Sequence, residues 1–246
     1  MIRYYSTNRD VKTIAGITPF AGSVSFKEAL LAGQAPDEGL FMPDTIPSLA
    51  MSDIIALREK PYWQAALLVA GAFLSGEFSL TVLEEIVKDA YNYPVPLEAV
   101  YPRAFILRLD QGPTASFKDF AARMMARLMS HSRPEGERIN ILVATSGDTG
   151  SAVGEAFKGV AGIDVTILYP AAEVSAMQKK QLDTIGDNVQ AVSVDGKFDD
   201  CQNLVKEAFS DPELAGLNLS SANSINFGRI LPQLSLIHIS EPTRPY

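Results

Sequence analysis

The sequence predicts an α/β fold in which a parallel sheet lies between two layers of helices, preceded by a mainly helical N-terminal region. In the second part of the chain, strand and helix alternate three times with short connections, which is the pattern of a parallel sheet with right-handed crossovers. Residues 139–144 form a near-continuous apolar run, typical of a strand buried on both faces. Before Pro94 and Pro96 the apolar residues recur mainly at helical spacing, and helices usually end before such prolines. We therefore expect a helical domain over residues 1–95 and an α/β domain over residues 96–234.

Four helices are expected in the N-terminal region. Ser25 and Glu28 have the spacing of a capping box, and Gly33 follows as a C-terminal stop. Ser52 is expected to cap a second helix, which Pro61 closes. The predicted helices cover residues 25–33, 52–60, 62–74 and 79–91. Residues 40–43, Leu-Phe-Met-Pro, form an apolar cluster that we expect within a loop.

The second part is expected to begin with a strand over residues 104–109 that leads into a Gly-Pro turn. The remaining predicted strands cover residues 139–144, 164–169 and 189–194, and the predicted helices include residues 153–157, 175–185 and 199–209. From residue 235 the chain shows neither helical nor strand periodicity, and its last residues include two prolines. We therefore predict that residues 235–246 are an appended, non-native tail.

Composition narrows the classes of function. The net charge of −8, with no basic run, argues against a nucleic-acid partner and favours a small-molecule substrate. Cys201 is the single cysteine, so no internal disulfide can form, which fits a reducing compartment. The apolar stretch at residues 65–74 is too short to cross a membrane, and the N-terminus has no secretory signal. We therefore expect a cytoplasmic protein, while the oligomeric state stays open.

Metal chemistry and a Ser-His-Asp triad are not expected. His131 and His238 are the two histidines, and neither has the spacing of a metal motif or of a nucleophile elbow.

Lys118 is the first candidate for chemistry. The Gly-Pro turn delivers the chain into a helix, and Ser116 with Asp119 has the spacing of a capping box at its start. Lys118 then lies in the first turn, where the partial positive charge of the helix disfavours an ammonium by about 0.3–1 kcal/mol. Packing between Phe117 and Phe120 would favour the neutral amine further, and a neutral amine on a rigid element can attack a carbonyl. The alternative is a solvated lysine whose charge Asp119 balances.

The second candidate is the loop at residues 145–150, Thr-Ser-Gly-Asp-Thr-Gly, between a buried strand and a helix. Ligands of parallel α/β sheets bind at the carboxyl ends of strands, and the N–H groups at a helix start can hold an anion. Gly147 and Gly150 would allow close approach, and the loop carries three hydroxyls. It lacks the Walker ending and the dinucleotide glycine spacing, so a carboxylate or phosphate is the expected ligand. A plain capped turn remains an equal alternative.

Residues 112–120, Gly-Pro-Thr-Ala-Ser-Phe-Lys-Asp-Phe, together with the loop at 145–150, closely resemble the motifs of threonine synthase in its longer form. This family belongs to the fold type II pyridoxal-phosphate enzymes. Supporting stretches lie at residues 24–26, 39–43 and 221–226, and the resemblance runs from Tyr4 to about Gln233. It implies a three-layer, tryptophan synthase β-like fold and a cytoplasmic enzyme of threonine biosynthesis.

The resemblance implies that Lys118 carries pyridoxal 5'-phosphate and moves protons during catalysis. O-phospho-L-homoserine and water would become L-threonine and phosphate, which is a lyase reaction. The residues implied to contact the cofactor are Lys118, Ser146, Gly147, Asp148, Thr149 and Gly150. The residues implied to contact the substrate are Thr145, Ser146, Thr149, Asn223, Ser224 and Asn226, the last three at its phosphate.

Alternatives remain at several of these positions. Asn223, Ser224 and Asn226 can also be polar turn residues that cap the next helix. Phe117 could pack near the cofactor ring, although a place in the core is preferred. The alternative functions are a related phospholyase, a threonine dehydratase, and a folded fragment without catalysis.

Two departures from the family pattern stand out. Residues 37–39 read Asp-Glu-Gly where the family usually has Asp-Gly-Gly. Family members also continue well past Gln233 with a second α/β portion that holds the cofactor phosphate. The resemblance therefore implies a C-terminally truncated member that binds the cofactor weakly, if at all, and is weakly active or inactive.

Overall fold

The computed structural model describes residues 1–11 and 16–240. Its centre is a four-stranded sheet formed by β6 (Ile139–Ala144), β7 (Ile163–Pro170), β8 (Val189–Val194) and β9 (Leu219–Ser220). The strand order is β8-β7-β6-β9, and every neighbouring pair is parallel. The parallel α/β arrangement expected from the sequence is therefore confirmed.

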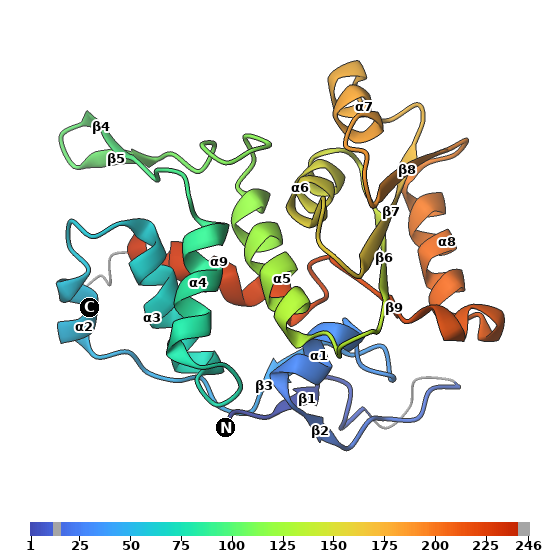
Figure 1. Cartoon of the computed structure of the whole chain (residues 1–246), viewed down its shortest axis with the longest axis horizontal. Helices are drawn as coiled ribbons and strands as arrows, with labels where there is room; N and C mark the ends of the chain where they lie inside the picture. Colours follow the sequence, from blue (N-terminus) through green and yellow to red (C-terminus); the bar gives the residue numbers. More distant parts are fainter. Residues whose placement is uncertain (12–15, 241–246) are drawn as a thin grey trace.

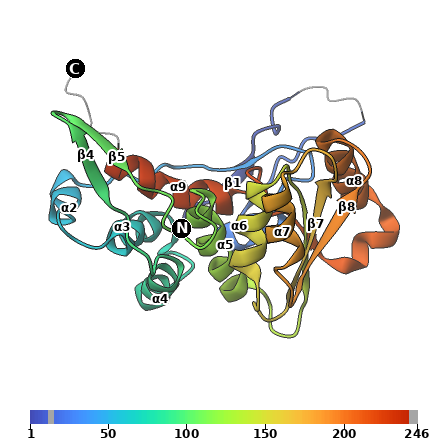
Figure 2. The same cartoon turned by 90° about the horizontal axis from the view of Figure 1, so that it is seen from above.

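Helices cover both faces of this sheet (Figure 2). On one side lie α5 (Lys118–Ser132), α6 (Asp148–Phe157) and α7 (Ala176–Asp183), and on the other lies α8 (Phe198–Ser210). Side chains alternate along β6, so that Ile141 and Val143 join the main core while Ala144 packs with Cys201 of α8. The result is the predicted three-layer architecture.

The helices of the N-terminal region are α1 (Phe26–Ala32), α2 (Met51–Ala56), α3 (Tyr62–Leu74) and α4 (Leu80–Ala90). Ser25 and Glu28 form the predicted capping box on α1, and the Ser79 hydroxyl caps α4. The prediction that Ser52 caps the second helix is wrong, because α2 begins at Met51 after Ala50, which supplies no side-chain cap.

Three short strands in this region were missed. β1 (Tyr4–Ser6) pairs antiparallel with both β2 (Ser23–Val24) and β3 (Phe41–Pro43). The loop expected at residues 40–43 is therefore mostly strand. Strands of two or three residues are too short to display an alternating pattern, which is why periodicity did not reveal them.

The strand expected at residues 104–109 is present, but it does not join the central sheet. β5 (Ala104–Leu107) pairs with β4 (Leu97–Tyr101) as an antiparallel hairpin that projects from the body of the molecule (Figures 1 and 2). A short 3-10 helix, η1 (Pro212–Leu217), connects α8 to β9.

The expectation that residues after 234 lack regular structure is wrong as far as residue 240. The helix α9 (Phe227–Ser240) lies across α3 and α5, where it is drawn in red in Figure 1. Ser235 and Leu236 are buried, and the hydroxyls of Ser235 and Tyr62 are 2.6 Å apart. Pro232 inside the helix obscured its periodicity in the sequence. Residues 241–246 lie outside the described residues, and the origin of the tail stays a prediction.

The main core is continuous between the two parts of the chain. Tyr4 packs edge-on against Phe227 with ring centroids 5.0 Å apart, so the first strand contacts the last helix. The domain boundary expected near residue 95 stays a prediction. No helix among the residues placed by the structure is both long enough and apolar enough to cross a membrane.

A buried carboxylate organises the turn that departs from the family pattern. Asp37 is fully buried and accepts hydrogen bonds from the Ser6 hydroxyl, the Phe20 N–H and the Gly39 N–H at 2.5, 2.8 and 3.1 Å. Burial by itself would raise the pKa of Asp37, but these three hydrogen bonds together hold that pKa below its ordinary value. Glu38 adopts a left-handed backbone with φ of 60°, a conformation that costs glycine less than glutamate.

We predict that Asp37→Asn lowers the free energy of unfolding by about 1–3 kcal/mol at pH 7, because an amide cannot accept all three hydrogen bonds. The lowered pKa means that the stabilisation by Asp37 is complete above about pH 5 and fades as the pH falls below about 4. Denaturant unfolding across this range measures the difference between the two proteins. The matched control is Asp195→Asn at an exposed position, and an equal loss in both variants would contradict the prediction.

Candidate active site

The predicted turn before α5 is present. The Ala115 N–H donates to the Gly112 carbonyl at 3.1 Å. Ala115 has a left-handed backbone with φ of 54°, which is uncommon for a residue with a Cβ. Such backbone strain often accompanies functional sites, and here it lies three residues before Lys118.

Asp119 does not take the place that the sequence suggested. Its buried carboxylate accepts from the Thr114 N–H at 2.9 Å and from the Thr114 hydroxyl at 2.7 Å. The predicted capping box of Ser116 and Asp119 is therefore wrong, and α5 starts after Phe117 without a side-chain cap. The reading in which Asp119 balances the charge of Lys118 is wrong as well, because this carboxylate is turned back to the preceding turn.

Lys118 is the first residue of α5, and its side chain is 24% exposed. Its Nζ lies 3.6 Å from Asp148 Oδ2, so the amine and the loop at residues 145–150 are adjacent. Nζ also lies 5.1 Å from the centroid of the Phe117 ring. Phe117 is 46% exposed, so its preferred place in the core is wrong, and the ring instead lies beside the amine.

The Thr145 hydroxyl shapes the loop after β6. Its Oγ1 accepts hydrogen bonds from the N–H groups of Gly147 and Gly150 at 3.0 and 2.8 Å. The side chain is buried, so this hydroxyl is occupied within the protein. The contact between Thr145 and substrate was expected from the resemblance. The geometry favours a different role for Thr145, which is to fix the path of the backbone.

The two loop glycines are required by the protein itself. Gly147 has φ of 137°, and a Cβ there would lie 2.2 Å from Gln178 Nε2. A Cβ on Gly150 would lie 2.5 Å from Thr145 Cγ2 and 2.9 Å from Ile167 Cγ2. Close packing of α6 against β7 therefore explains Gly150 without a ligand, whereas Ser146, just before α6, is exposed.

The remaining loop side chains face outward. Ser146 is exposed and Thr149 is half-buried, and their hydroxyls form no hydrogen bond within the described part of the chain. Asp148 lies between two partners, since Oδ1 accepts from Gln178 Nε2 at 2.9 Å while Oδ2 faces Lys118. The site thus presents one amine, one carboxylate and two free hydroxyls.

The polar stretch at 223–226 divides into two kinds of residue. Asn226 is fully buried, and its Nδ2 donates to the carbonyls of Leu30 and Ser221 at 2.8 and 2.9 Å. Its Oδ1 accepts from the Gly228 N–H at 2.9 Å, at the start of α9. Asn226 therefore matches the turn-and-cap alternative. Asn223 is half-buried and Ser224 is exposed, so these two remain the candidates for ligand contact.

Sequence reasoning missed Arg229, two residues beyond the start of α9. It is 2% exposed, and its Nη1 donates to the Ala222 carbonyl at 2.7 Å while Nε has no partner. Burial lowers the pKa of its guanidinium to about 10. No acidic side chain pairs with it in residues 1–11 or 16–240. An anion would complete such a site, and the signal in the sequence was an arginine directly after a polar turn.

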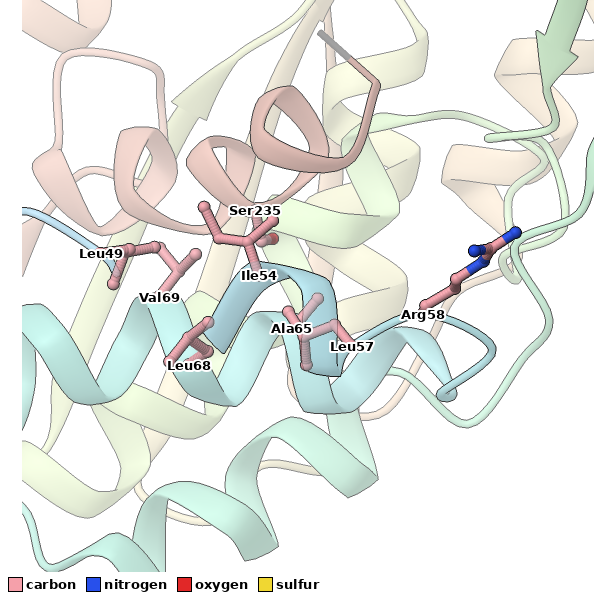
Figure 3. Close-up of a pocket in the computed structure, with 8 residues that line it drawn as sticks. All are labelled: Leu49, Ile54, Leu57, Arg58, Ala65, Leu68, Val69 and Ser235. Carbon is pink, nitrogen blue, oxygen red and sulfur yellow. The ribbon is translucent and has the colours of Figure 1, made fainter. Parts of the chain in front are cut away.

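A separate cavity of about 210 Å³ lies between α2, α3 and α9. Figure 3 shows its lining, which is formed by Leu49, Ile54, Leu57, Arg58, Ala65, Leu68, Val69 and Ser235. Arg58 points away from the apolar side chains in this view. The cavity contains none of the predicted site residues, and its apolar lining offers no group for acid–base or covalent chemistry.

Comparison with known proteins agrees with this geometry. The family described as "Pyridoxal-phosphate dependent enzyme" matches residues 95–228, more than half of the chain. The chain belongs to the pyridoxal-phosphate dependent enzyme family. A second family, "Threonine synthase N terminus", matches residues 3–91.

Individual relatives narrow the likeness within this family. Threonine synthases of Haemophilus influenzae and Escherichia coli are 44% and 41% identical over 212 residues, which is 86% of this chain. The chain spans about half the length of these relatives, 49% in each case.

Solved structures share the fold. The pyridoxal-phosphate-bound threonine synthase of Brucella melitensis superposes with a TM-score of 0.85 at 39% identity, over 99% of this chain and 53% of that one. The Escherichia coli threonine synthase gives 0.84 at 37% identity, over 96% and 53%. The expected type II fold is therefore confirmed for this family member.

We predict that Thr145→Val lowers the free energy of unfolding by about 1–3 kcal/mol, because the N–H groups of Gly147 and Gly150 would be buried without an acceptor. The matched control is Thr149→Val, whose hydroxyl is unbonded, with an expected change within about 0.5 kcal/mol. Urea denaturation of the two variants measures both values. Equal stability of the two variants would show that the Thr145 hydroxyl does not hold the loop.

Proposed function

We propose that the protein acts as a pyridoxal-phosphate-dependent threonine synthase, converting O-phospho-L-homoserine and water to L-threonine and phosphate. The observation that supports it most directly is the 3.6 Å distance between Lys118 Nζ and Asp148 in the loop after β6. A lysine at the start of a rigid helix suits a cofactor that bears an aldehyde. The adjacent loop at a helix N-terminus is of the type that binds anions, which suits the carboxylate of an amino-acid substrate. The proposed reaction is that of the threonine synthases to which the chain is similar.

Lys118 is assigned to bond covalently to the cofactor and then to move protons at the α and β carbons of the substrate. Pyridoxal phosphate, when bound, supplies an electron sink for the negative charge that develops on the substrate. The residues around Lys118 fit such a group, because the amine lies beside the exposed Asp148 and the exposed ring of Phe117, and the nearby hydroxyls of Ser146 and Thr149 are unbonded.

The substrate carboxylate is assigned to the first turn of α6. The hydroxyls of Ser146 and Thr149 are unbonded, and the partial positive charge of the helix start favours an anion. Thr145 contributes indirectly, by holding the backbone of Gly147 and Gly150 in place.

The phosphate of the substrate is assigned to the stretch around the start of α9. Asn223 and Ser224 have accessible polar groups, and Arg229 has a buried guanidinium that lacks an anionic partner in the described residues. Asn226 is assigned to hold the turn that presents them.

We further propose a domain boundary near residue 95 and a non-native tail from residue 235. We also propose a cytoplasmic location, which the free thiol of Cys201 supports.

We expect pyridoxal 5'-phosphate, added in excess and fixed by borohydride reduction, to label Lys118 selectively, because this amine lies at the loop that receives the cofactor. Peptide mass spectrometry locates the label. Lys206, an exposed lysine on α8, serves as the internal comparison. Labelling of Lys118 no greater than that of Lys206 would count against the assignment.

With pyridoxal 5'-phosphate in excess, incubation with O-phospho-L-homoserine is expected to release phosphate and threonine in equal amounts at a low rate, and Lys118→Ala should reduce this rate by about 100- to 10,000-fold. Phosphate detection together with amino-acid analysis measures both products. Release of 2-oxobutanoate and ammonia would instead indicate a dehydratase. A chain that is labelled on Lys118 yet releases no phosphate would contradict the catalytic part of the proposal.

A further inference from the structure

Gln178 on α7 contacts the candidate active site without a role in the chemistry assigned above. Its Nε2 donates to Asp148 Oδ1 at 2.9 Å, and the other carboxylate oxygen of Asp148 faces Lys118 Nζ. A series of contacts thus runs from Gln178 of α7 through Asp148 of α6 to Lys118 of α5. We propose that Gln178 is a positioning residue that holds the Asp148 carboxylate against the Lys118 amine and so controls the reactivity of that amine.

The amide of Gln178 is fixed at its other end. Its Oε1 accepts from the Ser175 N–H at 3.0 Å, and its backbone N–H donates to Ser175 Oγ at 3.2 Å. These two bonds form the capping box of α7. Because the oxygen of the planar amide is anchored by the helix cap, the direction of the nitrogen is set before it reaches Asp148.

The loop backbone is shaped to admit this side chain. Gly147 has φ of 137°, and a Cβ at that position would lie within 2.2 Å of Gln178 Nε2 and 2.5 Å of its Cδ. Any other residue at 147 would displace the amide. The Gln178 side chain therefore packs on the loop as well as bonding to it.

Among the described residues, Asp148 is the charged group that acts most directly on the Lys118 amine. Asp119, the nearest acid in sequence, is bonded to Thr114, and Asp148 is the single acidic side chain that pairs with Lys118 in the portion of the chain that the structure describes. Within that portion, α6 presents Asp148 to the amine and α7 reaches it only through the neutral Gln178. A neighbouring carboxylate stabilises an ammonium, and an ammonium cannot attack a carbonyl. Any change that releases Asp148 should therefore make Lys118 more reactive.

Trace labelling with acetic anhydride, without cofactor, tests this inference on the whole chain. Mass spectrometry gives the labelling of Lys118 relative to Lys206. We expect Gln178→Met to raise this ratio by about 2- to 5-fold, the effect of losing a partly exposed ion pair. Asp148→Asn should raise it at least as much. Because both act through one contact, the double variant should equal Asp148→Asn alone.

Two variants separate positioning from helix stability. Ser175→Ala weakens the cap of α7 but keeps the amide of Gln178, and Gln181→Met makes the same type of substitution at an exposed position of α7. Both should leave the ratio unchanged. Gln178→Asn keeps the amide but is too short to reach, so it should behave as Gln178→Met does and provides a second measurement should that variant fold poorly. The inference is overturned by an unchanged ratio in Gln178→Met and Gln178→Asn, by additivity with Asp148→Asn, or by an equal rise in Ser175→Ala.

The inference rests on the proposed function only in treating Lys118 as the reactive amine. The acetylation ratios are measured without pyridoxal 5'-phosphate, so they test the Gln178 contact alone. Failure to trap the cofactor at Lys118 would contradict the proposed function. Unchanged acetylation of Lys118 in the Gln178 variants would contradict the positioning role of Gln178.

Discussion

The packing of α5 against α6 determines the distance between the Lys118 amine and the loop after β6, and the candidate site depends on that distance. Many of the buried residues of α6 are small, among them Gly150, Ser151 and Ala152, which lets neighbouring elements approach closely. Arg127 of α5 also donates to the Ala156 carbonyl at 3.2 Å, which ties the far ends of the two helices. Lys118 is the first residue of one helix and Asp148 the first of the other, so side-by-side packing brings the two together.

Much of this arrangement could be predicted from the sequence because its signals are local. The apolar run at 139–144 and the alternation of strand and helix identified the parallel sheet. The Gly-Pro pair identified the turn before Lys118, and the Thr-Ser-Gly-Asp-Thr-Gly loop was expected at the end of a strand, where it lies. These features depend on residues close in sequence, whose conformational preferences act without knowledge of the tertiary fold.

The parts that could not be predicted depend on long-range partners. Asp119 had the spacing for a capping box with Ser116, but its buried carboxylate accepts from the half-buried Thr114 instead. The proposed roles of Gln178 and Arg229 depend on tertiary contacts and burial, which the spacing of residues in the sequence does not reveal. Pro232 concealed α9, although the contact between the Tyr62 and Ser235 hydroxyls and the burial of Leu236 hold that helix in place.

The position of α9 constrains the order in which the chain can fold during synthesis. This helix is the last element described, yet it packs on α3 and its Phe227 contacts Tyr4 of the first strand. Domains usually fold from the N-terminus as they leave the ribosome. Here Tyr4 is translated more than two hundred residues before its partner Phe227, so this part of the apolar surface stays uncovered throughout that interval.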